Sequence, residues 1–149
     1  MCIALIILPL LAAAIAATIR SNRFRPWLLP PVAVVHLVLT TFALLHPESA
    51  GVTRWLALDP PGRIVLLILS TLFLICAVYS VGYLRYRSEL SNRIFCVGLL
   101  CFLAATSFVV CSQHLGLMWV AIEATTLASV FLVTFYGRQL LSRRPGSMR

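Results

Sequence analysis

The sequence predicts an all-α, polytopic membrane protein with five transmembrane helices, its N-terminus outside and its C-terminus in the cytoplasm. Hydrophobic residues make up 61% of the 149 residues and charged residues only 11%, with a mean hydropathy of +1.00. A soluble domain is nearer half apolar and a quarter charged, so this composition indicates a chain that lies in lipid. Five apolar runs alternate with short polar segments, and the arginines gather in every second segment.

The first two apolar runs are separated by a short basic segment. No basic residue precedes the first run, whereas a signal peptide needs one, so we expect an uncleaved helix over residues 2–19. Pro26 and the Pro30-Pro31 pair bound the start of the second helix, where the missing N–H groups would be unpaired in any case.

A polar segment at 46–62 precedes the third helix, and its Asp59-Pro60-Pro61 sequence is typical of an N-cap followed by a proline-bearing first turn. The fourth and fifth runs are separated only by Ser112-Gln-His-Leu, and one helix through both would far exceed the bilayer thickness. We therefore expect a helical hairpin there. The expected single membrane domain, residues 1–149, has helices at about 2–19, 27–45, 63–84, 94–111 and 115–136, followed by a basic cytoplasmic tail at 137–149.

All 12 basic residues are arginines, and their positions set the expected topology. With the N-terminus outside, the inside segments 20–26, 85–93 and 137–149 hold 3, 3 and 4 arginines, and the outside segments hold only Arg54 and Arg63. This distribution follows the positive-inside rule. Because the cations stand between apolar runs and not along one helical face, the net charge of +8 indicates topology signals and argues against nucleic-acid binding.

One carboxylate, Glu123, lies inside the apolar run 115–136, which holds no other charge. At 1.5 Å per residue it lies roughly 12 Å from the start of the run, near the midplane of a hydrocarbon core about 30 Å thick. An acid there costs several kcal/mol unless it is paired or protonated, so we expect a proton-transfer role, with a structural interhelical hydrogen bond as the alternative. Thr126, His36 and His114 are possible secondary relay residues. For His36, a hydrogen bond to a neighbouring helix is the alternative.

The five cysteines all lie in apolar runs and form no CxxC pair or zinc-ligand spacing with a histidine. We interpret them as small apolar side chains. No ligand spacing for an iron–sulfur cluster, nickel, flavin or nucleotide occurs either, so we expect no cofactor, no metal and no catalysis by this chain alone.

A family resemblance rests on four segments: Ala57-Leu-Asp-Pro, Tyr79-Ser-Val-Gly-Tyr-Leu84, Asn92-Arg-Ile-Phe95, and the stretch 112–129 with its Trp-Val-Ala-Ile-Glu motif. They resemble the N-terminal part of the proton-translocating antiporter-like subunits of complex I, Mrp-type cation/proton antiporters and group 4 hydrogenases. The stretch 112–129 is most similar to the hydrogenase-4 component F branch of formate hydrogenlyase complexes. The resemblance covers most of this chain but about a third of a full family member.

The resemblance implies that Glu123 matches the essential glutamate of the family's fifth helix, which pairs there with a lysine on a later helix. It implies a truncated or split membrane subunit of a hydrogenase or NADH-quinone-oxidoreductase-like complex, multi-pass in a bacterial inner membrane. Its partners would be the lipid bilayer and other membrane and peripheral subunits, and it would contribute to proton translocation through a buried glutamate, Glu123. A purely structural, membrane-anchoring subunit and a small oligomeric proton-coupled transporter are the alternatives.

Overall fold

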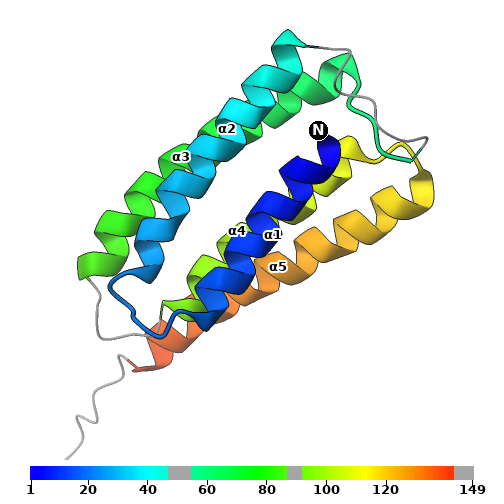
Figure 1. Ribbon diagram of the computed structural model, residues 1–149. Helices are drawn as coiled ribbons and strands as arrows, with labels where there is room; N and C mark the ends of the chain where they lie inside the picture. The colour runs from blue at the N-terminus through cyan, green and yellow to red at the C-terminus, as the bar shows by residue number, and fades with distance from the viewer. Residues whose placement is uncertain (47–54, 87–91, 143–149) are drawn as a thin grey trace, which may run out of the picture.

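The computed structural model describes residues 1–46, 55–86 and 92–142, and the side chains among them up to residue 133 except residue 86. Within these ranges the chain is helical apart from short connections (Figure 1), so the all-α prediction is confirmed there. An isolated antiparallel bridge joins Leu56 to Ser112. The elements are α1 (Cys2–Thr18), the 3-10 helix η1 (Arg25–Leu28), α2 (Leu29–Leu45), α3 (Pro60–Tyr86), α4 (Arg93–Cys111) and α5 (Leu115–Ser142).

Several helix ends differ from the predicted ones. The predicted start of the second helix falls within η1, so α2 itself begins at Leu29. Helix α3 begins at Pro60, directly after Asp59, whose carbonyl oxygen accepts a hydrogen bond from the Arg63 N–H at 3.1 Å. Helix α5 continues past residue 136 to Ser142, because the residues after Gly137 are good helix formers and the expected tail begins with a helical turn. The rest of that tail, 143–149, lies outside the described residues.

The helices pack as two pairs with a fifth helix beside them. Helix α2 packs mainly on α3, α1 on α4, and α5 on the far side of α4. Figure 1 shows that the N-terminus and the connections before α3 and α5 lie at the same end of the bundle. There the two connections are joined by hydrogen bonds from Ala57 N to the Cys111 carbonyl and from Gln113 N to the Trp55 carbonyl, each 3.0 Å long. The expected hairpin of the last two helices is present.

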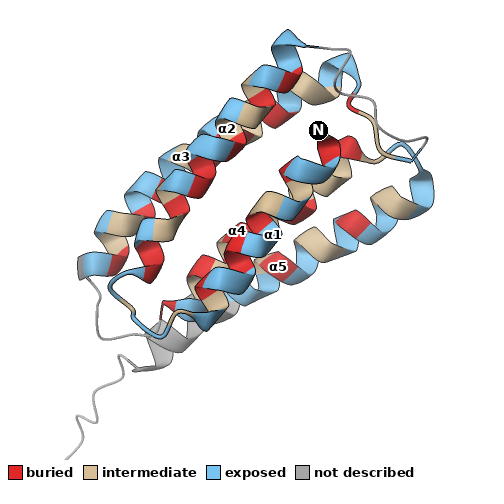
Figure 2. Ribbon diagram, in the orientation of Figure 1, coloured by how far each residue is buried: buried red, intermediate tan, exposed pale blue. Residues whose placement is uncertain are grey.

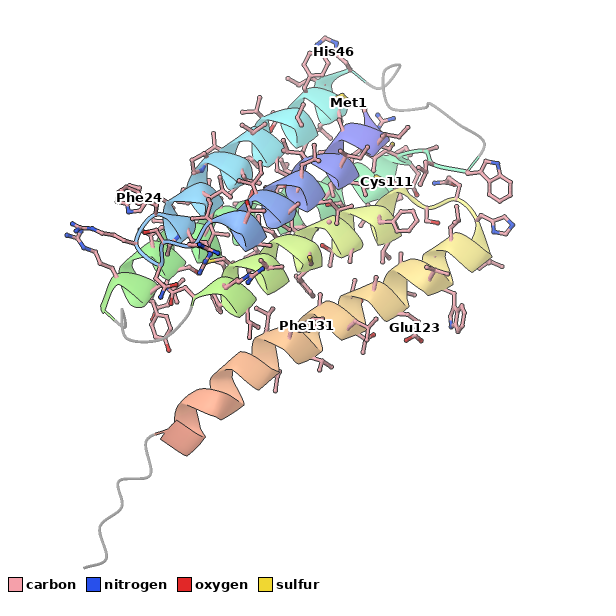
Figure 3. All side chains as sticks on the ribbon, turned by 60° about the horizontal axis from the view of Figure 1, so that its bottom comes forward. Met1, Phe24, His46, Cys111, Glu123 and Phe131 are labelled. Atoms are coloured by element: carbon pink, nitrogen blue, oxygen red, sulfur yellow. The ribbon has the colours of Figure 1, made fainter. Side chains whose placement is uncertain are left out.

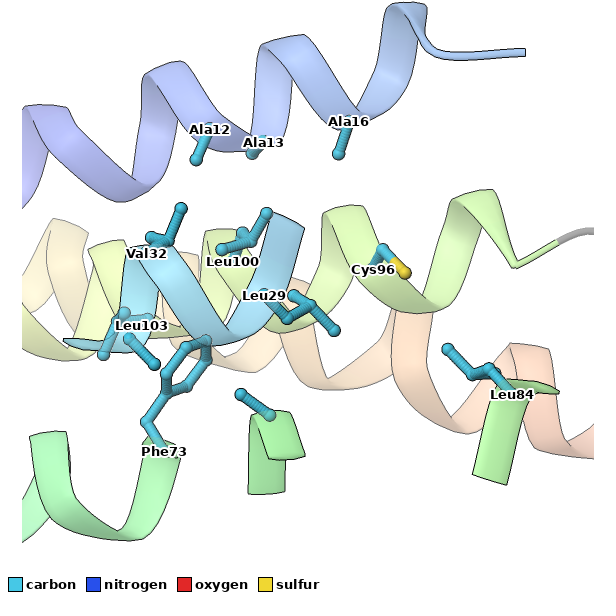
Figure 4. Packing of buried hydrophobic residues seen from close by; sticks show 12 residues of the cluster. Ala12, Ala13, Ala16, Leu29, Val32, Phe73, Leu84, Cys96, Leu100 and Leu103 are labelled. Atoms are coloured by element: carbon cyan, nitrogen blue, oxygen red, sulfur yellow. The ribbon is translucent and has the colours of Figure 1, made fainter. Parts of the chain in front are cut away.

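The packed interior consists of two apolar clusters. The larger one joins all of the first four helices, and alanines of α1 let its backbone approach the others closely (Figure 4). The smaller cluster includes Cys2, Leu5, Leu66 and Cys111, nearer the end where the N-terminus lies. Figure 2 shows buried residues on the facing sides of these helices and exposed residues on the outer sides.

Four helical segments are long and apolar enough to cross a membrane, namely Arg25–Leu45, Pro60–Arg85, Arg93–Cys111 and Leu115–Val133. Helix α1 is equally apolar in character but shorter, at 17 residues. The outer faces carry many large apolar side chains, which suits contact with lipid or with further helices. These features agree with a polytopic membrane protein.

Candidate functional site

Helix α5 carries Glu123 and is attached to the bundle along a narrow stripe. Among its side chains up to residue 133, the buried ones are Ala121 and Ala128, and only 11% of the residues in its apolar span are buried, against 44% for the span of α4. Small residues permit the close approach: a Cβ atom added to Gly98 of α4 would lie 3.3 Å from Leu132 Cδ2. Most of the surface of α5 is therefore covered by nothing in the described part of the chain.

The Glu123 side chain lies on that uncovered surface. It follows the buried Ala121 by two residues, or about 200° around the helix, and Figure 3 shows it pointing away from the other helices. Along the helix, Glu123 lies near the middle of the apolar segment Leu115–Val133. The carboxylate therefore lies halfway along the span, as expected. The described helices do not bury it, in contrast to the expectation of a buried glutamate.

The hydroxyl groups near Glu123 are turned onto their own helix. Thr126 is exposed, one turn further along the same face, and its Oγ1 donates to the Ile122 carbonyl at 2.9 Å. Thr125 donates to the same carbonyl at 2.7 Å. Since each hydroxyl has a single proton, these two groups can only accept a further hydrogen bond. Glu123 and Thr126 are the two predicted site residues that the structure brings together.

His114 lies at the start of α5, about 14 Å along the helix from Glu123. Its Nδ1 accepts a hydrogen bond at 3.2 Å from the N–H of Gly116, so the imidazole caps the first turn, as an N-cap side chain does. Its ring also packs on that of Trp55, with 4.9 Å between the ring centroids. In this structure His114 stabilises the first turn of α5. Its predicted relay role stays a prediction.

His36 lies in the bundle interior and is fully buried. Its Nδ1 is 2.9 Å from Ser70 Oγ on α3, and its Nε2 is 3.1 Å from Ser107 Oγ on α4. Thr40 Oγ1 donates to the His36 carbonyl and lies 3.1 Å from Ser70 Oγ. Both ring nitrogens therefore have partners on neighbouring helices, the arrangement given above as the alternative to a relay.

The proton positions in this network are linked. Ser70 Oγ and Ser107 Oγ each lie 2.8 Å from a carbonyl of their own helix, those of Leu66 and Leu103. A neutral imidazole has one N–H and one acceptor nitrogen, so one serine must donate to the ring while the other accepts from it. The network can thus satisfy either tautomer of His36 by rotating two hydroxyl groups.

Sequence reasoning missed the residues that complete this interior network and the role of Arg25. Arg25 is 3% exposed. Its Nε donates to the Ala16 carbonyl at 2.9 Å, its Nη1 to Asn22 Oδ1 at 3.0 Å, and its Nη2 to the Ile19 carbonyl. A guanidinium at the last carbonyls of α1 satisfies acceptors that the helix leaves open. Its position in a basic segment had suggested only a topology signal.

Comparisons with known proteins give one similarity. The chain is similar to a Hydrogenase-4 component F homolog of Methylacidiphilum infernorum (isolate V4), with 24% identity over 139 residues. The aligned region is 89% of this chain and 29% of that relative, so this chain spans less than a third of the relative's length. No protein-family profile and no solved structure matches the chain.

Proposed function

We propose that the chain is a membrane subunit, or the first part of one, of a hydrogenase or NADH-quinone-oxidoreductase-like complex, and that it contributes to proton translocation through Glu123. The similarity to a Hydrogenase-4 component F homolog over 89% of the chain supports the kind of complex. The four long apolar helices support its place in the membrane. Electron transfer would take place in other subunits.

The observation that carries the proposal is the position of Glu123 on the uncovered face of α5, halfway along an apolar segment. A charged side chain at the bilayer centre costs about 2.5–3.5 kcal/mol on insertion scales, so it is retained where something compensates for it. Because the described helices provide no partner, the compensating group would come from helices beyond these five, in a continuation of the chain or in another subunit.

A carboxyl group in that position can hold and release a proton, and its charge state would change the proton affinity of a cation placed against it. Thr126 offers an acceptor on the same face, which would help to order water or a donor between the two surfaces. In this proposal, α5 presents one half of a proton-transfer site and the rest of the assembly presents the other half.

The proposal includes five membrane spans, with the N-terminus outside and the C-terminus in the cytoplasm of a bacterial inner membrane. Helices α1 to α5 alternate in direction through the bundle, which supports an odd number of crossings (Figure 1). The arginine-rich segments 20–26 and 85–93 would then both face the cytoplasm, as the positive-inside rule requires.

The test is Glu123→Gln in the assembled complex, with Glu123→Asp beside it. Glutamine keeps the shape and hydrogen-bonding groups of the side chain but carries no charge. We expect Glu123→Gln to lower substrate-driven proton uptake into membrane vesicles by at least about tenfold, a loss typical for removing a positioned proton-transfer group. Glu123→Asp should keep part of the uptake.

Assembly of the complex, measured by native gel electrophoresis, separates this function from an anchoring role. The matched control is Thr71→Ala, which removes an exposed hydroxyl bonded only to its own helix. Full proton uptake by an intact Glu123→Gln complex would favour a purely structural membrane subunit and contradict the proposal.

A further inference from the structure

A groove of about 630 Å³ lies where the segment between α1 and α2 meets the end of α3. Each of these two elements contributes one arginine and at least one apolar residue to the lining. We call it the arginine groove and define it by Asn22, Arg23, Trp27, Val81, Leu84 and Arg85. Figure 3 shows nitrogen-bearing side chains gathered at this end of the bundle, around Phe24.

The arginine groove lies at the level where the apolar helices end. The candidate spans Arg25–Leu45 and Arg93–Cys111 begin with an arginine here, and the span Pro60–Arg85 ends with one. Trp27 is 59% exposed, and tryptophan favours the boundary between headgroups and acyl chains. The groove therefore faces the headgroup layer of one leaflet.

The positive charge of the groove is not balanced by a described carboxylate. The described acids are Asp59, which precedes the opposite end of α3, and Glu123 on the outer face of α5. Glu89 lies outside the described residues. Arg23 and Arg85 are both exposed, so their guanidinium groups are accessible to an anion from the surrounding solution or membrane.

The wall that carries Arg23 is held in place from two sides. Asn22 accepts a hydrogen bond from Arg25 Nη1 on its side-chain oxygen, and its carbonyl accepts one from Asn92 Nδ2 at 3.2 Å. Arg25 and Asn92 are both nearly fully buried. A binding site whose backbone is already fixed loses less conformational entropy when a ligand binds.

We propose that the arginine groove binds an anionic phospholipid, with its phosphodiester between Arg23 and Arg85. Guanidinium groups donate paired N–H bonds to phosphate oxygens, and basic pockets between membrane helices bind anionic headgroups. The exposed Trp27 ring and the half-buried Val81 would cover the glycerol and the upper acyl chains. A free phosphate would leave the apolar side chains of Trp27 and Val81 uncovered, and this is why a lipid fits the groove better.

Tryptophan fluorescence tests this directly. The chain has three tryptophans, so a Trp55→Phe/Trp119→Phe background leaves Trp27 as the reporter. In vesicles of phosphatidylcholine and phosphatidylglycerol, bromine atoms on the phosphatidylglycerol acyl chains should quench Trp27 more strongly than the same amount on phosphatidylcholine. Replacing both arginines, as Arg23→Gln/Arg85→Gln, should lower the relative affinity for phosphatidylglycerol by about tenfold, since each arginine near an anionic surface contributes a few-fold.

The matched control is Arg20→Gln/Arg93→Gln, which removes the same charge from an adjoining groove of about 600 Å³ that shares Asn22. It should change the preference for phosphatidylglycerol by less than about twofold. Far-UV circular dichroism and size-exclusion chromatography verify that each variant is folded. If both double variants lost the preference for phosphatidylglycerol equally, the preference would come from the general surface charge and not from a site, and the proposal would be overturned. Loss of the preference on adding inorganic phosphate would show a free-anion site, and no preference in the parent chain would also overturn the proposal.

Discussion

The hydrogen bonds of His36 to α3 and α4 allow a quantitative test of what holds the bundle together. Ser70 and Thr71 are neighbours on α3, and each hydroxyl donates to its own helix at 2.8 Å. They differ in that Ser70 is buried and also contacts His36 Nδ1 and Thr40 Oγ1, whereas Thr71 is exposed. An interhelical hydrogen bond in a membrane protein contributes on average about 0.6 kcal/mol and at most about 1.7 kcal/mol.

Ser70→Ala should therefore lower the free energy of unfolding by about 1–2 kcal/mol, because two contacts are lost and a buried ring nitrogen is left without its partner. Thr71→Ala should lower it by less than about 0.5 kcal/mol, as surface substitutions do. A double-mutant cycle of His36→Ala and Ser107→Ala should give a coupling of about 0.6 kcal/mol, from the 3.1 Å contact to Nε2. Titration of the purified protein with sodium dodecyl sulfate in mixed micelles, followed by far-UV circular dichroism, measures these quantities. Equal losses for Ser70→Ala and Thr71→Ala, or no coupling in the cycle, would refute the reasoning.

Three further substitutions test other contacts. Gly98→Val should separate α4 from α5 and lower the free energy of unfolding by about 1–3 kcal/mol, because a Cβ there already meets Leu132 at 3.3 Å. Gly82→Ala, with open space around it, should leave the contact unchanged. Cross-linking between the two helices measures the separation. His114→Ala should cost about 1 kcal/mol by removing the cap of α5 and His114→Asn should restore most of it, measured as amide hydrogen exchange in the first turn. Arg25→Gln should cost about 1.5–3 kcal/mol, since charge-assisted bonds to the end of α1 are lost, and Arg25→Lys should rescue it only in part. Unfolding measurements that rank Arg25→Lys with the parent would contradict a role for the planar guanidinium.

The helices could be predicted from the sequence because their signals are local. Runs of apolar residues interrupted by arginines and prolines determine about where each helix begins and ends. Asp59-Pro60-Pro61 indicated the cap and first turn of α3, although the predicted range began only at residue 63. The end of α5 could not be predicted in the same way. Gly137 and the arginines after it suggested a stop, but helix-forming residues follow and the helix continues to Ser142.

The partners of His36 could not be predicted, since they depend on how three helices rotate against one another. Ser70 and Ser107 stand in apolar runs like other small residues, and nothing local distinguishes them from Thr71. The sequence did offer one signal for such a network: α2, α3 and α4 each carry a hydroxyl residue at similar depth, namely Thr40, Ser70 and Ser107. The buried role of Arg25 could not be predicted either, because it stands among other arginines whose side chains are exposed.

The depth of Glu123 followed from counting residues, but its direction did not. Lipid-facing and helix-facing sides of α5 are both apolar, so hydrophobicity does not reveal which side packs on α4. The small residues Ala121 and Ala128 mark the packed side, and Glu123 lies on the other one. That orientation is what makes a partner beyond these five helices necessary to the proposed function.

The most direct test of the central claim is the reaction of Glu123 with carbodiimides. Carbodiimides attack carboxyl groups, and only a lipid-soluble carbodiimide reaches a carboxyl group that lies in hydrocarbon. Mass spectrometry of the purified chain in lipid nanodiscs should find Glu123 modified by dicyclohexylcarbodiimide and not by a water-soluble carbodiimide. In the assembled complex the modification should slow or be lost as other helices cover α5. Modification by the water-soluble reagent at a rate similar to that of Asp59, or an unchanged rate on assembly, would contradict the account.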